Sequence, residues 1–163
     1  MASHLRVDKI EPVDGVPTGG GGGIVQVVAG TSGAQATSQS TTFSSASLEA
    51  TITPKFSTSK VLIQVNGPMT GFAGGSGSQQ GGLKVYRGGS GGTSVEASTN
   101  GLSLQYGPAD TYSDVHILYL DSPATTSATT YTVMMSRRAG DTTYSFNRNS
   151  QQTASIILME VSA

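Results

Sequence analysis

The sequence contains no cysteine and no tryptophan, and charged residues make up only 12% of its 163 positions. Without cysteine, neither a disulfide framework nor a thiolate metal site can form. The nine lysines and arginines are scattered along the chain, and Arg137-Arg138 is their densest cluster. Because nucleic-acid binding needs a continuous basic surface that faces phosphates, this distribution argues against a nucleic-acid partner.

Long apolar segments are missing as well. No run approaches the roughly 18 apolar residues of a membrane-spanning helix. The first residues, from Met1 to Arg6, lack the apolar stretch of a secretion signal. We therefore expect synthesis in the cytoplasm and no insertion into a membrane.

Residues that carry chemistry are few. The two histidines are His4, in the N-terminal segment, and His116, inside an apolar stretch. Nucleophilic catalysis needs a base beside the nucleophile, and metal-assisted hydrolysis needs clustered ligands. Neither pattern occurs, so we expect no enzymatic activity, no cofactor and no resident metal ion. Four aspartates near the ends of expected strands leave calcium binding open as an alternative to turn capping: Asp110, Asp114, Asp121 and Asp141.

What the sequence does contain is glycine, 22 times, with serine and threonine about as frequent. These small residues form clusters, and the runs between them are rich in Val, Ile, Leu, Tyr and Thr with a period of two, which is typical of short strands joined by turns. The runs cover 24–29, 48–53, 60–66, 83–87, 114–121, 129–136, 143–147 and 153–161. Such a series predicts an antiparallel β-sandwich or jelly roll of eight or more strands. We also expect a tight turn at 138–141 that joins two strands into a hairpin.

The glycine run Gly19 to Gly23 divides the chain. Residues 1–23 hold so few apolar groups that burial cannot offset their chain entropy. The segment is therefore either a flexible tail or an extended arm that docks on another chain. We expect the arm, with Leu5, Val7 and Ile10 as its apolar anchors, followed by a β-sandwich domain over 24–163.

Two expected strands are apolar on both faces. In the run 115–120 and in the last strand, both alternating sets of side chains are largely apolar. Such a strand needs cover on both faces: one comes from the opposite sheet, and the other from a loop or a neighbouring subunit. We expect a subunit interface that contains His116, Leu118, Tyr119, Ile157 and Met159.

The chain opens with LRVDKIEPVDGVPTGGGGGIVQVV, in which a Leu-x-Val-Asp-x-Ile segment precedes a glycine-rich link. This opening resembles the start of bacteriophage tail-fibre and other virion proteins, particularly those of marine cyanophages. The body, from IVQVVAG through ITPKFSTSKVLIQVNG to TASIILMEV, resembles the compact head of such fibres. That head is similar in outline to the trimeric jelly rolls of the tumour-necrosis-factor and complement families. Unlike longer tail fibres, the chain has no shaft repeats and no coiled coil.

The resemblance implies a virion structural protein that is made in the host cytoplasm. It would be a short homotrimeric tail fibre or knob, docked on other virion proteins by its N-terminal arm, with a host-surface glycan as a further partner. The alternative is a capsid decoration protein that stabilises the phage head. A receptor surface would include Tyr106 and Tyr112, in the long connection 88–113, because a loop tyrosine can stack on a sugar ring and hydrogen-bond to it.

Overall fold

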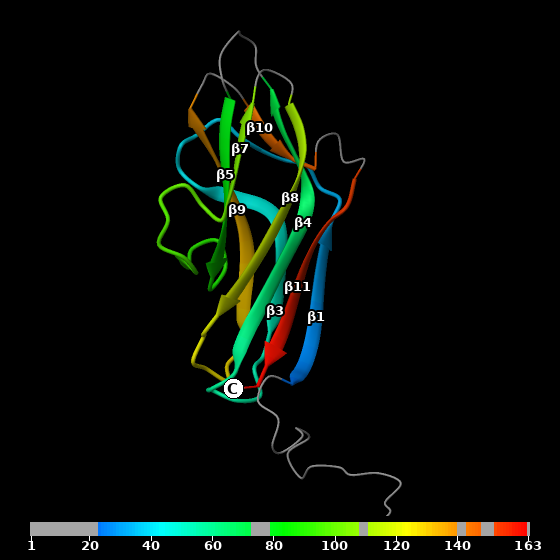
Figure 1. The fold of residues 1–163 in the computed structure, drawn as a ribbon, viewed down its shortest axis with the longest axis vertical. Coiled ribbons are helices and arrows are strands. Elements are labelled where there is room, and N and C mark those ends of the chain that lie inside the picture. The colour runs from blue at the N-terminus through cyan, green and yellow to red at the C-terminus, as the bar shows by residue number, and fades with distance from the viewer. Residues whose placement is uncertain (1–22, 73–78, 108–110, 140–142, 148–151, 163) are drawn as a thin grey trace, which may run out of the picture.

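The computed structural model describes residues 23–72, 79–107, 111–139, 143–147 and 152–162. They form an elongated sandwich of two antiparallel sheets (Figure 1). The expected anchors Leu5, Val7 and Ile10 lie outside the described residues. Within the ranges given above, no helix is long and apolar enough to span a membrane.

Sheet A has six strands, and its long strands lie side by side in the order β1, β11, β4, β8. Their bounds are β1 (Ile24–Ser32), β11 (Ala154–Val161), β4 (Lys60–Phe72) and β8 (Thr111–Asp121). The short strands β10 (Thr143–Phe146) and β2 (Ala36–Ser38) continue the sheet beside the Phe72 end of β4.

Sheet B has five strands, with β9 between β3 and β5, and with β7 and β6 both paired to β5. The strands are β3 (Ser44–Ile52), β9 (Thr129–Ala139), β5 (Gln79–Arg87), β7 (Ser103–Gly107) and β6 (Thr93–Ser94). Among the eight longer strands of the two sheets, the first pairs with the last and the second with the seventh. This is a jelly-roll arrangement, so the predicted fold class is confirmed.

The core fills the space between the sheets, because each long strand turns alternate side chains inward. In β4 the inward set is Val61, Ile63 and Val65, all of which are fully buried. Sheet B contributes Leu48, Ile52, Leu83, Val85, Tyr131, Val133 and Met135. Apart from Met134, the buried apolar residues of the described chain form one continuous cluster, which fixes which face of each strand is left for other contacts.

Three details of the predicted strands were wrong. The connection expected at 88–113 contains β6 and β7. The strand that begins at Lys60 does not end at Gly67-Pro68 but continues as β4 to Phe72. Gly67 permits this, because a Cβ there would lie 2.5 Å from Cζ of Phe146, whose ring packs against the strand. Gly140 and Asp141 of the turn expected at 138–141 lie outside the described residues, but the flanking strands do not pair as a hairpin, since β9 belongs to sheet B and β10 to sheet A. The chain changes sheet between these strands, which places Phe146 in the shared core.

Candidate functional site

The strand register aligns apolar side chains in rows across the outer face of sheet A. One row contains Val27, Met159, Leu62 and Leu120, one from each of the four long strands. The next row contains Ala29, Ile157, Gln64 and Leu118. At the start of β1, Ile24 lies opposite Val161, the last residue of β11. We call these apolar side chains the sheet A patch: Ile24, Val27, Leu62, Leu118, Leu120, Ile157, Met159 and Val161.

Half of the sheet A patch is exposed, and the other half is partly buried. Five large apolar side chains are exposed among the described residues, and four of them belong to the patch: Ile24 (61%), Val27 (57%), Leu118 (69%) and Leu120 (47%). The inward neighbours in the same strands, such as Ile117 and Leu158, are buried. The exposure is therefore a property of this one face of β8 and β1.

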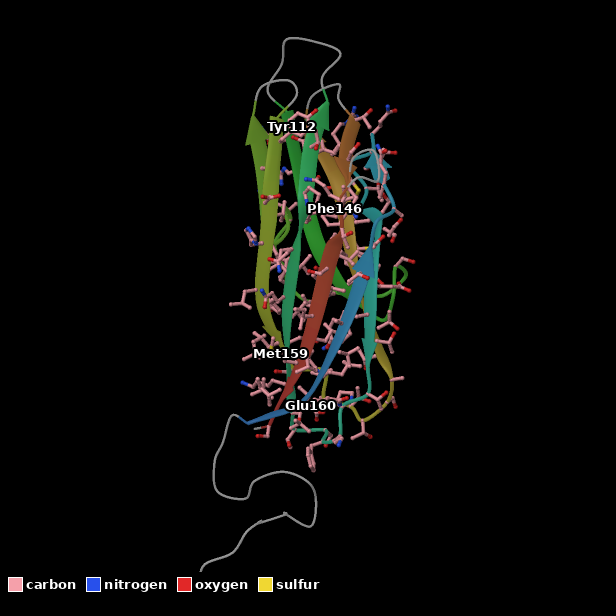
Figure 2. All side chains as sticks on the ribbon, turned by 90° about the vertical axis from the view of Figure 1, so that its right-hand side faces the viewer. Tyr112, Phe146, Met159 and Glu160 are labelled. Atoms are coloured by element: carbon pink, nitrogen blue, oxygen red, sulfur yellow. The ribbon has the colours of Figure 1, made fainter. Side chains whose placement is uncertain are left out.

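A β-bulge in β1 shapes the lower end of the patch. The register with β11 shifts between Ile24 and Gln26, so that Ile24 faces outward with Val27 while Gln26 turns inward. There Gln26 Nε2 donates a hydrogen bond of 2.6 Å to Oε2 of Glu160, which is fully buried. Figure 2 shows Glu160 near one end of the long axis.

The carboxylate of Glu160 also ties down the segment that follows β3. Its Oε1 accepts hydrogen bonds from the backbone N–H groups of Lys55 (2.8 Å) and Phe56 (3.2 Å). Burial alone would raise the pKa of Glu160, but these bonds and the one from Gln26 together lower it below the ordinary value. The charged form is therefore the one that the fold stabilises.

Polar groups border the patch toward the other end of the sheet. The next row contains Thr31, Ser155, Asn66 and His116. Nδ1 of His116 lies 2.6 Å from Oδ1 of Asn66 on the neighbouring strand. Between this pair and Leu118 the surface has a hollow of about 280 Å³, lined also by Gln64. The apolar surface thus ends at a polar edge with a recess beside its most exposed leucine.

Four of the five interface residues expected from the sequence lie together on this face: His116, Leu118, Ile157 and Met159. The fifth, Tyr119, does not. Its side chain packs against the core, and its hydroxyl donates a hydrogen bond of 2.8 Å to the carbonyl of Val95. The exposed residues of β1 were missed, because their outward position depends on the bulge and on pairing with the distant strand β11.

The two tyrosines expected on one receptor loop lie on strands of different sheets. Tyr106 belongs to β7 in sheet B, and its side chain is outside the described part of the structure. Tyr112 belongs to β8 and is 66% exposed, near the end of the molecule opposite Glu160 (Figure 2). It lines a hollow of about 320 Å³ with Pro68, Asp114 and Gln152, among others.

Of the aspartates considered for calcium, Asp110 and Asp141 lie outside the described residues, and Asp114 lines the hollow beside Tyr112. The two carboxylate oxygens of Asp121 accept hydrogen bonds of 3.1 and 3.0 Å from Nη1 of Arg87. Oδ2 of Asp121 also accepts a hydrogen bond of 2.7 Å from the Tyr131 hydroxyl. Burial and this bond raise the pKa of Tyr131 well above its ordinary value. In the part of the chain that the structure describes, no three His, Cys, Asp or Glu side chains are placed to hold a metal ion.

Comparisons with known proteins give structural neighbours only. No family model matches the sequence, and no curated protein matches it. Among solved structures, the fold is similar to the VP2 subviral particle of infectious bursal disease virus, at 16% identity and a TM-score of 0.41, over 85% of this chain and 37% of that one. The structure of the Gx strain of the same virus is similar at 14% identity and a TM-score of 0.42, over 100% of this chain and 42% of that one. This chain therefore spans about two fifths of the length of these neighbours, and because identities and TM-scores are both low, we transfer no function from them.

Proposed function

We propose that this chain is a structural subunit of a phage particle, a short trimeric tail fibre or knob whose copies pack through the sheet A patch. The observation that carries the proposal is the sheet A patch, in which outward-facing apolar side chains align across four strands and those on β1 and β8 are exposed. The resemblance of the opening segment to cyanophage virion proteins supports the proposal that the chain is part of a phage particle. In this proposal residues 1–23 dock the trimer on other virion proteins.

The size of the patch supports a protein partner. Two rows across four strands, with strands spaced by about 4.8 Å and rows by about 6.7 Å, cover together with Ile24 and Val161 roughly 300 Å². This is at the lower end of the range of about 300–600 Å² for the largest apolar patches on monomers, which are often functional. Lys60 and His116 flank the patch along β4 and β8, and the rows between them carry no charge. Copies of this chain can therefore approach one another here without like-charge repulsion.

The shape of the patch supports another copy of the same chain as that partner. Leu118 projects 69% exposed directly beside the hollow of about 280 Å³ that it lines with Gln64, Asn66 and His116. One face thus offers both an apolar projection and a recess. In a ring of identical subunits, the projection of one copy meets the recess of the next.

Sedimentation velocity at micromolar concentration tests the proposal. Unchanged protein should sediment as a trimer, and Met159→Asp should sediment as a folded monomer, because Met159 faces outward and the charge would be buried only in the assembly. Thr51→Asp is the matched control: it adds the same charge to an exposed position of sheet B and should leave the trimer intact. A monomeric unchanged protein contradicts the proposal.

A further inference from the structure

The only adjacent pair of arginines in the described chain lies on the other sheet, away from the sheet A patch. Arg137 and Arg138 are at the end of β9, where they line a pocket of about 190 Å³. The remaining lining residues are Thr41, Phe43, Thr99 and Ser136. Three segments that are distant in sequence thus build one small cationic recess with hydroxyl groups in its wall.

Two buried polar atoms of the residues that line this recess have no hydrogen-bond partner within the protein. Ser136 is 1% exposed, and its Oγ has no hydrogen-bond partner. Nε of Arg137 is also buried without a partner. Buried polar groups are normally paired, so two orphans that line the same pocket point to a ligand that supplies acceptors.

The described carboxylates do not neutralise the charge of the pocket either. Among the described residues no carboxylate forms an ion pair with Arg137 or Arg138. Glu96 is the acidic group in the adjoining loop, and it is engaged by Lys84 at 3.5 Å and by the Ser94 hydroxyl at 3.2 Å. Two arginines therefore line one recess, and no carboxylate of the described residues pairs with either of them.

The walls of the pocket are held in place before any ligand arrives. The backbone N–H of Arg137 donates a hydrogen bond of 2.8 Å to the carbonyl oxygen of Ser40, and this bond fixes the segment that carries Thr41. The Phe43 ring lies under the ammonium group of Lys84, 5.1 Å from its centroid. Asn100 packs directly on β5, because a Cβ at Gly82 would lie 2.4 Å from its carbonyl oxygen. Preorganisation of this kind lowers the entropy that binding costs.

We propose that this pocket binds an oxyanion group, a carboxylate, sulfate or phosphate carried by a larger ligand. Guanidinium groups bind such planar or tetrahedral anions through paired N–H donors, and the hydroxyls of Thr41, Thr99 and Ser136 can complete the shell. Because the pocket is on sheet B, it stays accessible when the outer face of sheet A is covered. The inference does not depend on the proposed virion role.

Titration calorimetry at low ionic strength tests the inference on the full chain. The probes are inorganic sulfate, inorganic phosphate, a short oligogalacturonide and a neutral galacto-oligosaccharide of equal length. We expect one site for at least one anionic probe and none for the neutral sugar. The preferred probe separates the sources: the oligogalacturonide indicates an acidic glycan, whereas phosphate or sulfate indicates those esters.

Three variants test whether the anion binds in this pocket. Arg138→Gln should weaken binding at least about tenfold, since hydrogen bonds between charged groups are the strong ones. Ser136→Ala should weaken it about threefold to tenfold without lowering the melting temperature, because the hydroxyl has no partner in the free protein. Lys55→Gln removes an exposed charge elsewhere and should change nothing. No binding of any anion, equal weakening by Lys55→Gln, or unchanged binding by both pocket variants would overturn the inference.

Discussion

At the scale of single residues, two buried tyrosines differ in whether their hydroxyl group has a hydrogen-bond partner. Tyr131 and Tyr144 are both fully buried, but only Tyr131 has a partner, the carboxylate of Asp121 at 2.7 Å. Burial alone raises the pKa of Tyr144 to about 12, so its hydroxyl stays neutral at any ordinary pH. The two side chains therefore bury the same chemical group with opposite energetic consequences.

We expect Tyr131→Phe to destabilise the fold by about 1.5–3 kcal/mol, since it removes a hydrogen bond to a charged group. Tyr144→Phe should be neutral or stabilising, because its hydroxyl is desolvated without compensation. Urea denaturation of both variants measures the difference. Equal losses of stability in the two variants would contradict the assignment.

Glu160 gives the fold a specific response to acid. Its folded pKa is lowered, so its contribution to stability is fully present above the ordinary pKa of 4.5 and is lost as pH falls through the lower folded pKa. Glu160→Gln should cost about 1–3 kcal/mol at neutral pH, because the amide nitrogen cannot accept a hydrogen bond. It should also flatten the acid limb of the stability curve, measured by denaturation between neutral pH and pH values below 4.5. Glu49→Gln, on an exposed position, is the control and should keep the acid limb of the unchanged protein.

At the scale of elements, β1 passes so close to sheet B that one position allows no side chain. A Cβ on Gly30 would lie 2.1 Å from the backbone oxygen of Glu49 in β3. Gly30→Ala should therefore destabilise the protein by about 1–3 kcal/mol, as overpacking does. Gly91→Ala has nothing within 4 Å of the added carbon and should change stability by less than about 0.5 kcal/mol. Thermal melting of the pair checks the prediction, and a similar loss in both would show that close packing at Gly30 is not the cause.

The sequence was sufficient for most of the strands and for the two-sided apolar character of two of them, because alternation is a local property, but β7 was missed inside the connection expected at 88–113. Leu118 and Met159 could be placed on a second apolar face for that reason. Tyr119 was wrongly placed with Leu118, because neighbouring residues of a strand point to opposite faces, and the partner of its hydroxyl, Val95, is distant in sequence. The arginine pocket was out of reach as well, because Thr41, Thr99 and Arg138 meet only through the fold.

At the scale of the whole molecule, the two candidate places in a phage particle differ in what is lost when the protein is missing. Deletion of residues 1–22 should leave a folded trimer that no longer joins particles, because the sandwich begins at β1. For a tail fibre, such particles should adsorb poorly to host cells and keep the heat resistance of their capsids. For a capsid decoration protein, adsorption should be normal and heat resistance reduced. Normal occupancy of the truncated protein on purified particles would contradict the attachment role.

The pairing of the first strand with the last has a consequence for biosynthesis. β11 inserts between β1 and β4, so sheet A is incomplete until residues 154–161 have left the ribosome. Until then β1 has an unpaired edge, and folding must wait for a contact between the two ends of the domain. The domain therefore cannot fold in stages during translation. It folds only after β11 has been synthesised, and assembly follows folding. A premature stop before residue 154 should yield a chain that stays sensitive to protease and aggregates, however much of the core it carries.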